Sequence, residues 1–313
     1  YYSQRATAGL IITEGTSPSP NGLGYARIPG LFNEAQVKGW KLVTDAVHAK
    51  GGKIFVQLMH TGRVSHSANL PAGAQVEAPT ADVCPGEMYT DAQGMKPHST
   101  PRAMLADEIA RCVSEFVKSA QFAVEAGFDG VELHAANGYL IEQFLNANVN
   151  QRTDAYGGSP AARNRFAIEV ARATVAAIGA DKVGIRLSPY GVFNSTGAYP
   201  DLEAQYLALA GEIQAKTTTA QAEAADNFTD NLTRAKATSE AWQKQVSMGM
   251  VPALDLATQA FLDVMNGTGG IRDEIAKLSK DGTIAKWTQS AIIGLSYVAD
   301  GAQILIRVFG VLI

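Results

Sequence analysis

The sequence predicts an α/β fold in which parallel strands alternate with helices. Short apolar runs and amphipathic helical patterns follow one another four times within the first 215 residues. Such alternation is typical of parallel strands joined by right-handed helical crossovers. Polar residues lie at the ends of these strands, where α/β barrels keep their functional groups. Four strand–helix units are half of a (β/α)8 barrel, so we expect a partial barrel followed by a region of another class.

The first unit begins with the apolar and β-branched run AGLIIT at residues 8–13, which predicts a strand. Residues 17–30 are rich in Pro and Gly and predict a loop. Asn33 is the predicted N-cap of the next helix, and Gln36 completes a capping-box pattern. Apolar residues at helical spacing then continue to the Gly-Gly pair at residues 51–52, which ends the predicted helix.

The second predicted strand, KIFVQLM at residues 53–59, is followed by the polar residues 60–63. Residues 65–101 contain many Pro, Gly and Ser and predict one long loop, and loops of this length inside compact domains are usually functional. A helix with Ile109 and Phe116 on its apolar face leads to the third strand.

The third strand is predicted at residues 128–133, FDGVEL, and His134, Asn137 and Tyr139 come directly after it. The remaining elements are an amphipathic helix, a fourth strand with the sequence KVGIRL and a further helix, at residues 159–178, 182–187 and 200–215. Because the carboxyl ends of parallel strands meet on one face of a barrel, we expect the polar residues at these ends to converge.

The alternation stops near Lys216, where we place a domain boundary. Residues 216–313 are predicted to be all-α, and residues 291–313 are mostly apolar, with Asp300 and Arg307 among them. That segment is long enough for a membrane span. Charged residues near the centre of a span cost about 2.5–3.5 kcal/mol each. A helix packed on protein is therefore favoured, and membrane insertion is the minor interpretation.

Composition excludes several other classes. The net charge of -4 and the lack of a dense Lys/Arg run argue against a nucleic-acid-binding protein. Cys84 and Cys112 form no CxxC pair, which excludes a disulfide framework and a cysteine-rich zinc site and suits the reducing cytoplasm. His60 and His66 have no cluster of Cys, Asp or Glu close by in the sequence, so no metal site is predicted.

The residue types at the strand ends favour a reaction on a conjugated double bond. His134 and Asn137 can both donate hydrogen bonds to one carbonyl oxygen, and Tyr139 can deliver a proton. A fixed Arg186 can stabilise negative charge on a reduced cofactor ring. No side chain can supply a hydride, so the chemistry requires a cofactor.

Residues 1–215 resemble the Old Yellow Enzyme family of FMN-dependent ene-reductases. The resemblance is carried by four segments: YYSQRATAGLIITEGT, GWKLVTDAVHAKGGKIFVQLMHTGRVSH, FDGVELHAANGYLIEQFLNANVNQRTDAYGGS and VGIRLSP. It implies a TIM barrel that contains FMN and reduces activated alkenes, such as enones and nitroalkenes, with NAD(P)H.

The same resemblance implies roles for the residues on the substrate side. His134 and Asn137 would bind the activating carbonyl or nitro oxygen of the substrate. Tyr139 would protonate the alkene carbon, and Tyr25 would lie over the substrate pocket. A small-molecule alkene is therefore the expected partner.

On the cofactor side, the resemblance implies that Gln57 and Arg186 contact the pyrimidine ring of the flavin and that Gly15 offers backbone contacts. Met59 stands where many members carry Trp, which would alter the shape of the pocket. The first strand of the family lies upstream of Tyr1. Nothing after residue 215 resembles its FMN phosphate site, so we expect weakened FMN affinity.

The segment after residue 220 resembles part of a phage tail tape-measure protein. The alternative function is therefore a non-catalytic fusion or chimera of a truncated flavin oxidoreductase with a phage structural segment. A half-barrel leaves its inner face and two strand edges bare. We expect the C-terminal helices, or a second copy of the chain in a homo-oligomer, to cover them.

Overall fold

A computed structural model describes residues 1–214 of the chain. The chain divides into two units, Tyr1–Ala222 and Glu223–Ile313, and every feature below belongs to the first. The predicted boundary near Lys216, the all-α region at residues 216–313 and the apolar segment at residues 291–313 lie outside the described residues and stay predictions. Within residues 1–214, no helix is long and apolar enough to cross a membrane.

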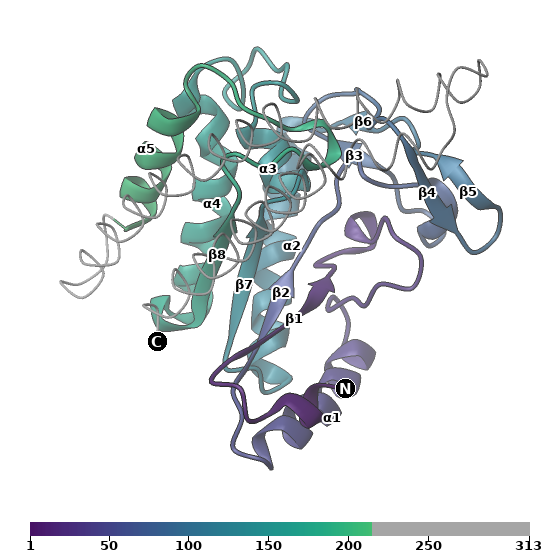
Figure 1. The fold of residues 1–313 in the computed structure, drawn as a ribbon, viewed down its shortest axis with the longest axis vertical. Helices are drawn as coiled ribbons and strands as arrows, with labels where there is room; N and C mark the ends of the chain where they lie inside the picture. The colour runs from purple at the N-terminus through teal and green to yellow at the C-terminus, as the bar shows by residue number, and fades with distance from the viewer. Residues whose placement is uncertain (215–313) are drawn as a thin grey trace, which may run out of the picture. The chain divides into compact units, whose positions relative to one another are not determined.

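Four parallel strands form the main sheet of the described region (Figure 1). They are β1 (Ile11–Thr16), β2 (Ile54–Leu58), β7 (Gly130–Ala135) and β8 (Val183–Leu187), and they neighbour one another in that order. Every adjacent pair is parallel, as the alternation of strands and helices predicted. Parallel strands that lie side by side in chain order form the wall of a barrel. The fold is therefore a partial (β/α)8 barrel.

Three amphipathic helices connect these strands. α1 (Glu34–His48) joins β1 to β2, α2 (Ala106–Glu125) joins β2 to β7, and α4 (Pro160–Ile178) precedes β8. α2 packs against β2 and β7, and α4 packs against α2 and β8. Ile109 and Phe116, at helical spacing on α2, are fully buried. The hydrophobic core therefore lies between the strands and these helices.

Shorter helices complete the described region. They are α3 (Leu140–Leu145), α5 (Leu202–Gln214) and the 3-10 helices η1 (Tyr2–Arg5), η2 (Pro20–Gly22), η3 (Ser67–Asn69), η4 (Ala180–Lys182) and η5 (Phe193–Ser195). α3 follows β7 after a loop of four residues, 136–139, and packs against α4. This short loop carries two of the three predicted catalytic residues.

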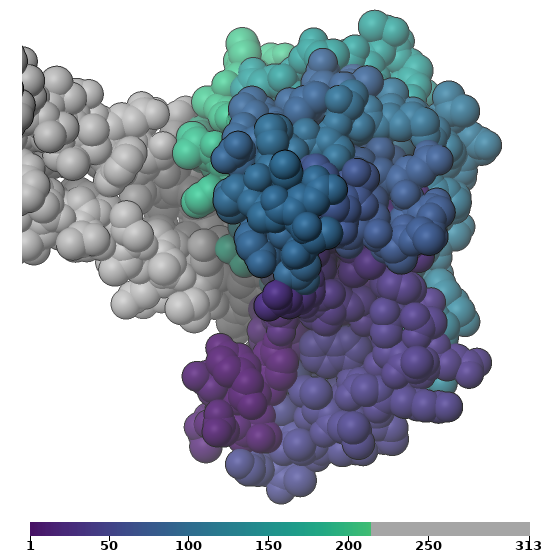
Figure 2. Space-filling view, turned by 90° about the vertical axis from the view of Figure 1, so that its right-hand side faces the viewer, coloured from purple at the N-terminus to yellow at the C-terminus, as the bar shows by residue number. Residues whose placement is uncertain are grey.

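The prediction of one long loop at residues 65–101 is wrong, because the segment contains β-structure. β4 (Glu87–Thr90) and β5 (Gly94–Pro97) form an antiparallel hairpin, and β3 (Glu77–Ala78) pairs with β6 (Arg102–Ala103). Strands of two to four residues are too short to show the alternating pattern by which a strand is recognised. The hairpin lies on the face that Figure 2 turns toward the viewer.

The boundaries of two predicted elements also differ from the structure. β1 spans Ile11–Thr16 rather than residues 8–13, so Glu14, Gly15 and Thr16 belong to the strand and not to the loop after it. An irregularity in the register with β2, between Ile12 and Gly15, lets the pairing continue through these polar residues. α5 begins at Leu202, slightly later than the predicted residue 200.

At the N-terminus of α1, the structure confirms Asn33 as the N-cap but shows a different hydrogen bond for the Gln36 side chain. The Asn33 side chain accepts a hydrogen bond from the Gln36 N–H at 3.0 Å, as an N-cap does. The Gln36 side chain, however, accepts from the N–H of Phe32 at 2.7 Å and not from that of Asn33. The reciprocal bond of the capping box is thus displaced by one residue, and it fixes the chain just before the helix.

Asp129 holds the amino ends of β2 and β7 together. Its carboxylate accepts hydrogen bonds from the N–H of Ile54 at 2.9 Å and from the Lys53 ammonium at 2.8 Å, and it lies 2.8 Å from His48 Nε2. Burial raises the pKa of Asp129, but the bonds from Lys53, His48 and Ile54 outweigh that effect and hold the pKa below its ordinary value. The carboxylate therefore stabilises the folded state in its ionised form.

We expect Asp129→Ala to lower the free energy of unfolding by about 1–3 kcal/mol, because the half-buried Ile54 N–H loses its acceptor. Asp129→Asn retains an acceptor and should cost less. Asp45→Asn, which breaks an exposed pair with Lys41 on α1, should cost less than about 0.5 kcal/mol. Urea denaturation of the three variants measures these differences.

The contribution of Asp129 should also depend on pH. Because its folded pKa is depressed, the contribution is complete above the ordinary aspartate pKa of about 3.9 and is lost as the pH falls through the folded value. The wild type and Asp129→Asn should therefore converge in stability in acid. A difference in unfolding free energy between the two proteins that stays constant from neutral pH down to pH values below the folded pKa of Asp129 would contradict this account.

Candidate active site

The register of the parallel strands places four polar side chains on one face of the sheet. Gln57 on β2 is paired with Glu132 on β7, and His134 on β7 is paired with Arg186 on β8. Side chains two residues apart on a strand point to the same side, so Glu132 and His134 share a face. The Gln57 Nε2 donates to Glu132 Oε1 at 2.6 Å, which ties two of these residues across the strands.

His134 lies inside β7 and not after it, which corrects its predicted position. The side chain is buried, and its Nδ1 accepts a hydrogen bond from the N–H of Ala136 at 3.3 Å. The proton of the neutral imidazole is therefore on Nε2. Burial, and then the positive charge of Arg186, lower the pKa of His134 to about 3. At neutral pH, His134 is an uncharged hydrogen-bond donor.

Two tyrosines meet beside His134. The ring of Tyr139 packs edge-to-face against the imidazole of His134, with 4.9 Å between the ring centroids. Its hydroxyl lies 3.2 Å from the hydroxyl of Tyr25, which comes from the loop before α1. Burial, and then the hydrogen bond with Tyr139, raise the pKa of Tyr25 above its usual range. The structure thus brings three of the predicted residues together and keeps the Tyr25 phenol neutral.

Asn137 is held by its backbone, which leaves its side chain available. Its N–H donates to Ser188 Oγ at 2.9 Å, and its carbonyl oxygen accepts from Asn194 Nδ2 at 2.7 Å. The residue has a φ of 58°, in the left-handed region that Asn tolerates better than most residues. The Asn137 carboxamide is half-buried and has no hydrogen-bond partner among residues 1–214.

The residues predicted to hold the flavin lie on three of the strands. Arg186 is paired with His134 across β7 and β8, so its side chain lies on the same face. Burial raises the pKa of Glu132, and the hydrogen bond from Gln57 and the positive charge of Arg186 only partly oppose that effect. Arg186 is half-buried, and its side chain has no hydrogen-bond partner within the described part of the chain. At Gly15, a Cβ atom would come within 2.5 Å of the Met59 Cε, so Gly15 lets the Met59 side chain lie against β1.

These residues form a donor set that fits a flavin ring. The ring has carbonyl oxygens and ring nitrogens along its pyrimidine edge, and a carboxamide and a guanidinium are suited to pair with that edge. Gln57 and Arg186 supply these groups from β2 and β8, on either side of β7. The burial of Gln57 and His134 keeps water away from this face of the sheet.

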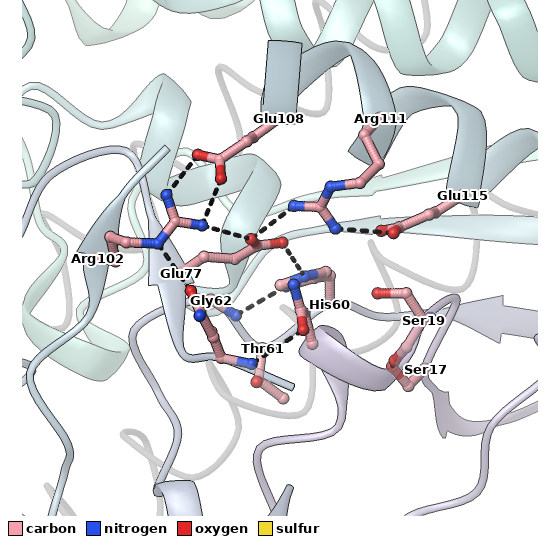
Figure 3. A network of polar contacts seen from close by, with 12 residues as sticks. Ser17, Ser19, His60, Thr61, Gly62, Glu77, Arg102, Glu108, Arg111 and Glu115 are labelled. Carbon is pink, nitrogen blue, oxygen red and sulfur yellow. Dashed lines mark hydrogen bonds and ion pairs between the residues drawn. The ribbon is translucent and has the colours of Figure 1, made fainter. Parts of the chain in front are cut away.

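A second network holds the loop after β2 (Figure 3). The side chains of His60 and Glu77 are both fully buried, and His60 Nε2 lies 3.4 Å from Glu77 Oε1. Arg111 on α2 donates to Glu77 Oε2 at 2.7 Å. Burial raises the pKa of Glu77, but His60, Asn21 and Arg111 outweigh it and hold the pKa at about 2. Glu77 is therefore ionised at neutral pH.

This buried network fixes loops that carry the candidate site. The carbonyl oxygen of His60 accepts from the N–H of Leu140, next to Tyr139, at 2.9 Å. The N–H of Thr61 donates to the carbonyl oxygen of Gly22, three residues before Tyr25, at 3.1 Å. The loop after β2 is thus the common support of both tyrosines.

Sequence reasoning missed four residues of this region: Glu132, Glu142, Ser188 and Asn194. Two of them had a signal in the sequence. Glu132 lies two residues before His134, so the period of a strand places both on one face. Glu142 is the charged residue in the apolar run YLIEQFL, where a carboxylate needs partners if it is buried. Ser188 and Asn194 follow the fourth strand and carry no comparable signal.

Comparison with known proteins identifies relatives for most of the chain. The profile of the NADH:flavin oxidoreductase / NADH oxidase family matches residues 1–274, which extends past the predicted boundary near Lys216. Putative 12-oxophytodienoate reductase 3 of Oryza sativa subsp. japonica is 50% identical over 192 residues, which cover 61% of this chain and 49% of the relative. Aldehyde reductase FrzD of Cladobotryum sp is 42% identical over 217 residues, which cover 68% and 55%.

Solved structures give the same result for the fold. Morphinone reductase has a TM-score of 0.65 and 46% identity, over 69% of this chain and 59% of that chain. An old yellow enzyme homologue from Zymomonas mobilis has a TM-score of 0.66 and 42% identity over the same shares. The chain spans about half the length of the curated relatives that it matches.

We expect the imidazole of His134 to stay neutral, with its proton on Nε2, from about pH 5 to 9, because burial and Arg186 depress its pKa. Nitrogen NMR shifts of the histidine side chains measure this, and the His134→Asn variant identifies the signal. A titration with a midpoint near the ordinary value of about 6.5 would contradict the described environment.

Proposed function

The chain belongs to the NADH:flavin oxidoreductase / NADH oxidase family, and from this premise we propose that it binds FMN and reduces activated alkenes with NAD(P)H. The substrates would be small molecules whose double bond is conjugated to a carbonyl or nitro group. The 12-oxophytodienoate reductases and morphinone reductase among the relatives are reductases by name, which supports this reaction class.

The observation that carries the proposal is the meeting of His134, Tyr139 and Tyr25 at the end of β7. The neutral His134 offers an Nε2–H, and Asn137 offers a carboxamide without a protein partner in the described region. Both can donate to the carbonyl or nitro oxygen of a substrate. Such bonds stabilise the negative charge that develops on that oxygen and make the distant carbon of the double bond electron-poor.

Tyr139 is the proposed proton donor. Its hydroxyl is hydrogen-bonded to that of Tyr25, and its ring is held against His134. A phenol that is fixed in this way can give its proton to the carbon next to the activating group. Tyr25, whose own raised pKa keeps it neutral, would orient the Tyr139 hydroxyl and cover the substrate.

Gln57 and Arg186 would hold the FMN ring, and Gly15 would contact it through its backbone. When bound, FMN would supply the hydride for the other carbon of the double bond, and NAD(P)H would restore its reduced form. The positive charge of Arg186 would favour a ring that carries negative charge. Glu132 would orient the Gln57 carboxamide through the 2.6 Å hydrogen bond between them.

Two further expectations belong to this proposal. A second copy of the chain would pair with a free strand edge of the partial barrel, because exposed edges present unpaired backbone groups. Cys84 and Cys112, both buried and unpaired, support a location in the reducing cytoplasm.

The binding of FMN by the purified chain is the experiment that tests this function. We expect the protein to retain flavin absorbance after incubation with FMN and desalting, and then to oxidise NAD(P)H when an enone such as 2-cyclohexenone is added. A protein that stays colourless after incubation with excess FMN would refute the proposal and support the alternative of a chain without catalytic activity.

For the loaded enzyme, we expect Tyr139→Phe to slow reduction of the enone by about 100-fold or more, because general acids typically contribute at least that much. The reduction of the flavin by NAD(P)H should be unaffected, since it needs no proton from Tyr139. Stopped-flow measurement of the two half-reactions separates these effects. Tyr25→Phe is the matched control and should slow enone reduction less, and an equal loss of both half-reactions in Tyr139→Phe would refute the proton-donor role.

A further inference from the structure

A buried carboxylate lies directly beneath the loop that presents Asn137. Glu142, on α3, has an exposed fraction of 1%. Its Oε2 accepts from the N–H of Gly138 at 2.7 Å, and both its oxygens accept from Ser188 Oγ, at 3.1 and 3.0 Å. Ser188 Oγ in turn accepts from the N–H of Asn137 at 2.9 Å. Two successive backbone N–H groups are thus bound to one carboxylate, one directly and one through a hydroxyl.

The conformation of this loop explains why it needs such support. Asn137 and Gly138 have φ values of 58° and 76°, so two consecutive residues lie in the left-handed region. That region costs a residue with a side chain roughly 1–2 kcal/mol. A Cβ atom on Gly138 would also come within 2.6 Å of Asn194 Cβ, so the loop is pressed against the segment after β8. Hydrogen bonds to both N–H groups offset the unfavourable backbone.

The same loop is tied to the segment after β8 by a second route. Asn194 Nδ2 donates to the carbonyl oxygen of Asn137 at 2.7 Å, and Arg63 Nη2 donates to the carbonyl oxygen of Asn194 at 3.0 Å. Both backbone polar groups of Asn137 are therefore bound by residues that follow β8.

We propose that Glu142 and Ser188 are positioning residues for the proposed reaction: together they hold the backbone of Asn137 so that its carboxamide faces the substrate oxygen. The proposal rests on the proposed function for its consequence in catalysis. The arrangement of the loop itself can be tested without substrate or FMN.

The protonation of Glu142 should be coupled to this loop. Burial raises the pKa of Glu142 to about 7, and hydrogen bonds from Gly138, Ser188 and Tyr206 only partly oppose the effect. All three of these groups donate to the carboxylate, so an added proton can be accepted only if the hydroxyl of Ser188 or Tyr206 turns around. Protonation therefore requires at least one of the bonds to rearrange.

Among the groups that surround Glu142, Glu142 itself is the one that we expect to change protonation near neutral pH. From the α5 side, Tyr206 Oη lies 3.5 Å away and Tyr199 faces it, and burial raises the pKa of both phenols, so they stay neutral. From α4, Arg163 donates to the carbonyl oxygen of Gly158 and to Gln205. From the β7–α3 loop and from β8 come the uncharged Gly138 and Ser188.

Selective isotope labelling reports on Gly138 directly. The sequence contains three Asn-Gly pairs, so labelling Asn carbonyl carbons and Gly nitrogens gives three signals, from Gly22, Gly138 and Gly267. Glu142→Gln identifies the signal of Gly138. In the wild type, its amide proton shift should change with pH with a midpoint near 7, whereas in Glu142→Gln it should stay constant. Gly22 donates to the backbone oxygen of Ser19 and is an internal control that should not change.

Ser188→Ala is the second variant, and it keeps the carboxylate. A second sample with labelled Ala carbonyl carbons and Asn nitrogens gives the amide signals of Asn69, Asn137 and Asn148. Ser188→Ala should shift the signal of Asn137 and leave that of Asn69 in place. Glu169→Gln, on α4, is the matched control, because its carboxylate accepts from Tyr156 and makes no contact with this loop. A Gly138 signal that is the same in the wild type and Glu142→Gln, or an Asn137 signal that is unchanged in Ser188→Ala, would overturn the proposal.

The loaded enzyme provides a separate measurement. Both variants should lower kcat/KM for the enone by about 10- to 100-fold, as small displacements of binding groups do, while flavin reduction by NAD(P)H keeps its rate. Unchanged kcat/KM in both variants would overturn the positioning role. If the wild type reduces no enone, the proposed function fails, and the NMR signals still decide whether Glu142 and Ser188 hold the loop.

Discussion

The register of β7 with β2 and β8 decides which side chains can meet at the candidate site. It pairs Gln57 with Glu132 and His134 with Arg186, and the alternation along β7 places Glu132 and His134 on one face. A slip of one residue would turn all of β7's polar groups away from this face. The burial of β7, with apolar Val131 and Leu133 packed on its other side, opposes such a slip.

Two buried glutamates, Glu77 and Glu142, fix the loops that follow the strands of the candidate site. Glu77 is ionised and paired with Arg111, and with His60 it fixes the loop after β2. Glu142 accepts two hydrogen bonds from the region around Asn137. Removing one partner from a buried ionic network leaves an uncompensated charge or donor, which is costly. The two carboxylates differ in that Arg111 compensates the charge of Glu77, whereas Glu142 has neutral partners and titrates near neutral pH.

Much of the barrel wall could be predicted from the sequence, because the apolar runs and helical spacing were long enough to be distinct. The Asn33 cap and the α2 face with Ile109 and Phe116 were confirmed in the same way. The short strands β3 and β6, within and just after residues 65–101, could not be predicted, since two residues are too few to show a period. His134 was assigned to a loop because polar residues usually end a strand, but its inward position in β7 is compatible with a buried, neutral imidazole. The bonds from Glu142 through Ser188 to Asn137 depend on contacts across 46 and 51 residues, which no local pattern records.

We propose that the flavin ring lies on the face formed by β1, β2, β7 and β8, with Arg186 beside it. The affinity for FMN is measured by titrating FMN into the purified chain and monitoring the quenching of flavin fluorescence. The test variant is Arg186→Met, and the control is Arg172→Met, in which an exposed arginine on α4 is replaced. Loss of a charged hydrogen bond of about 1.5–3 kcal/mol predicts affinity that is weaker by about 10- to 100-fold in Arg186→Met and unchanged in Arg172→Met. Equal FMN affinity in the wild type and both variants would contradict the account.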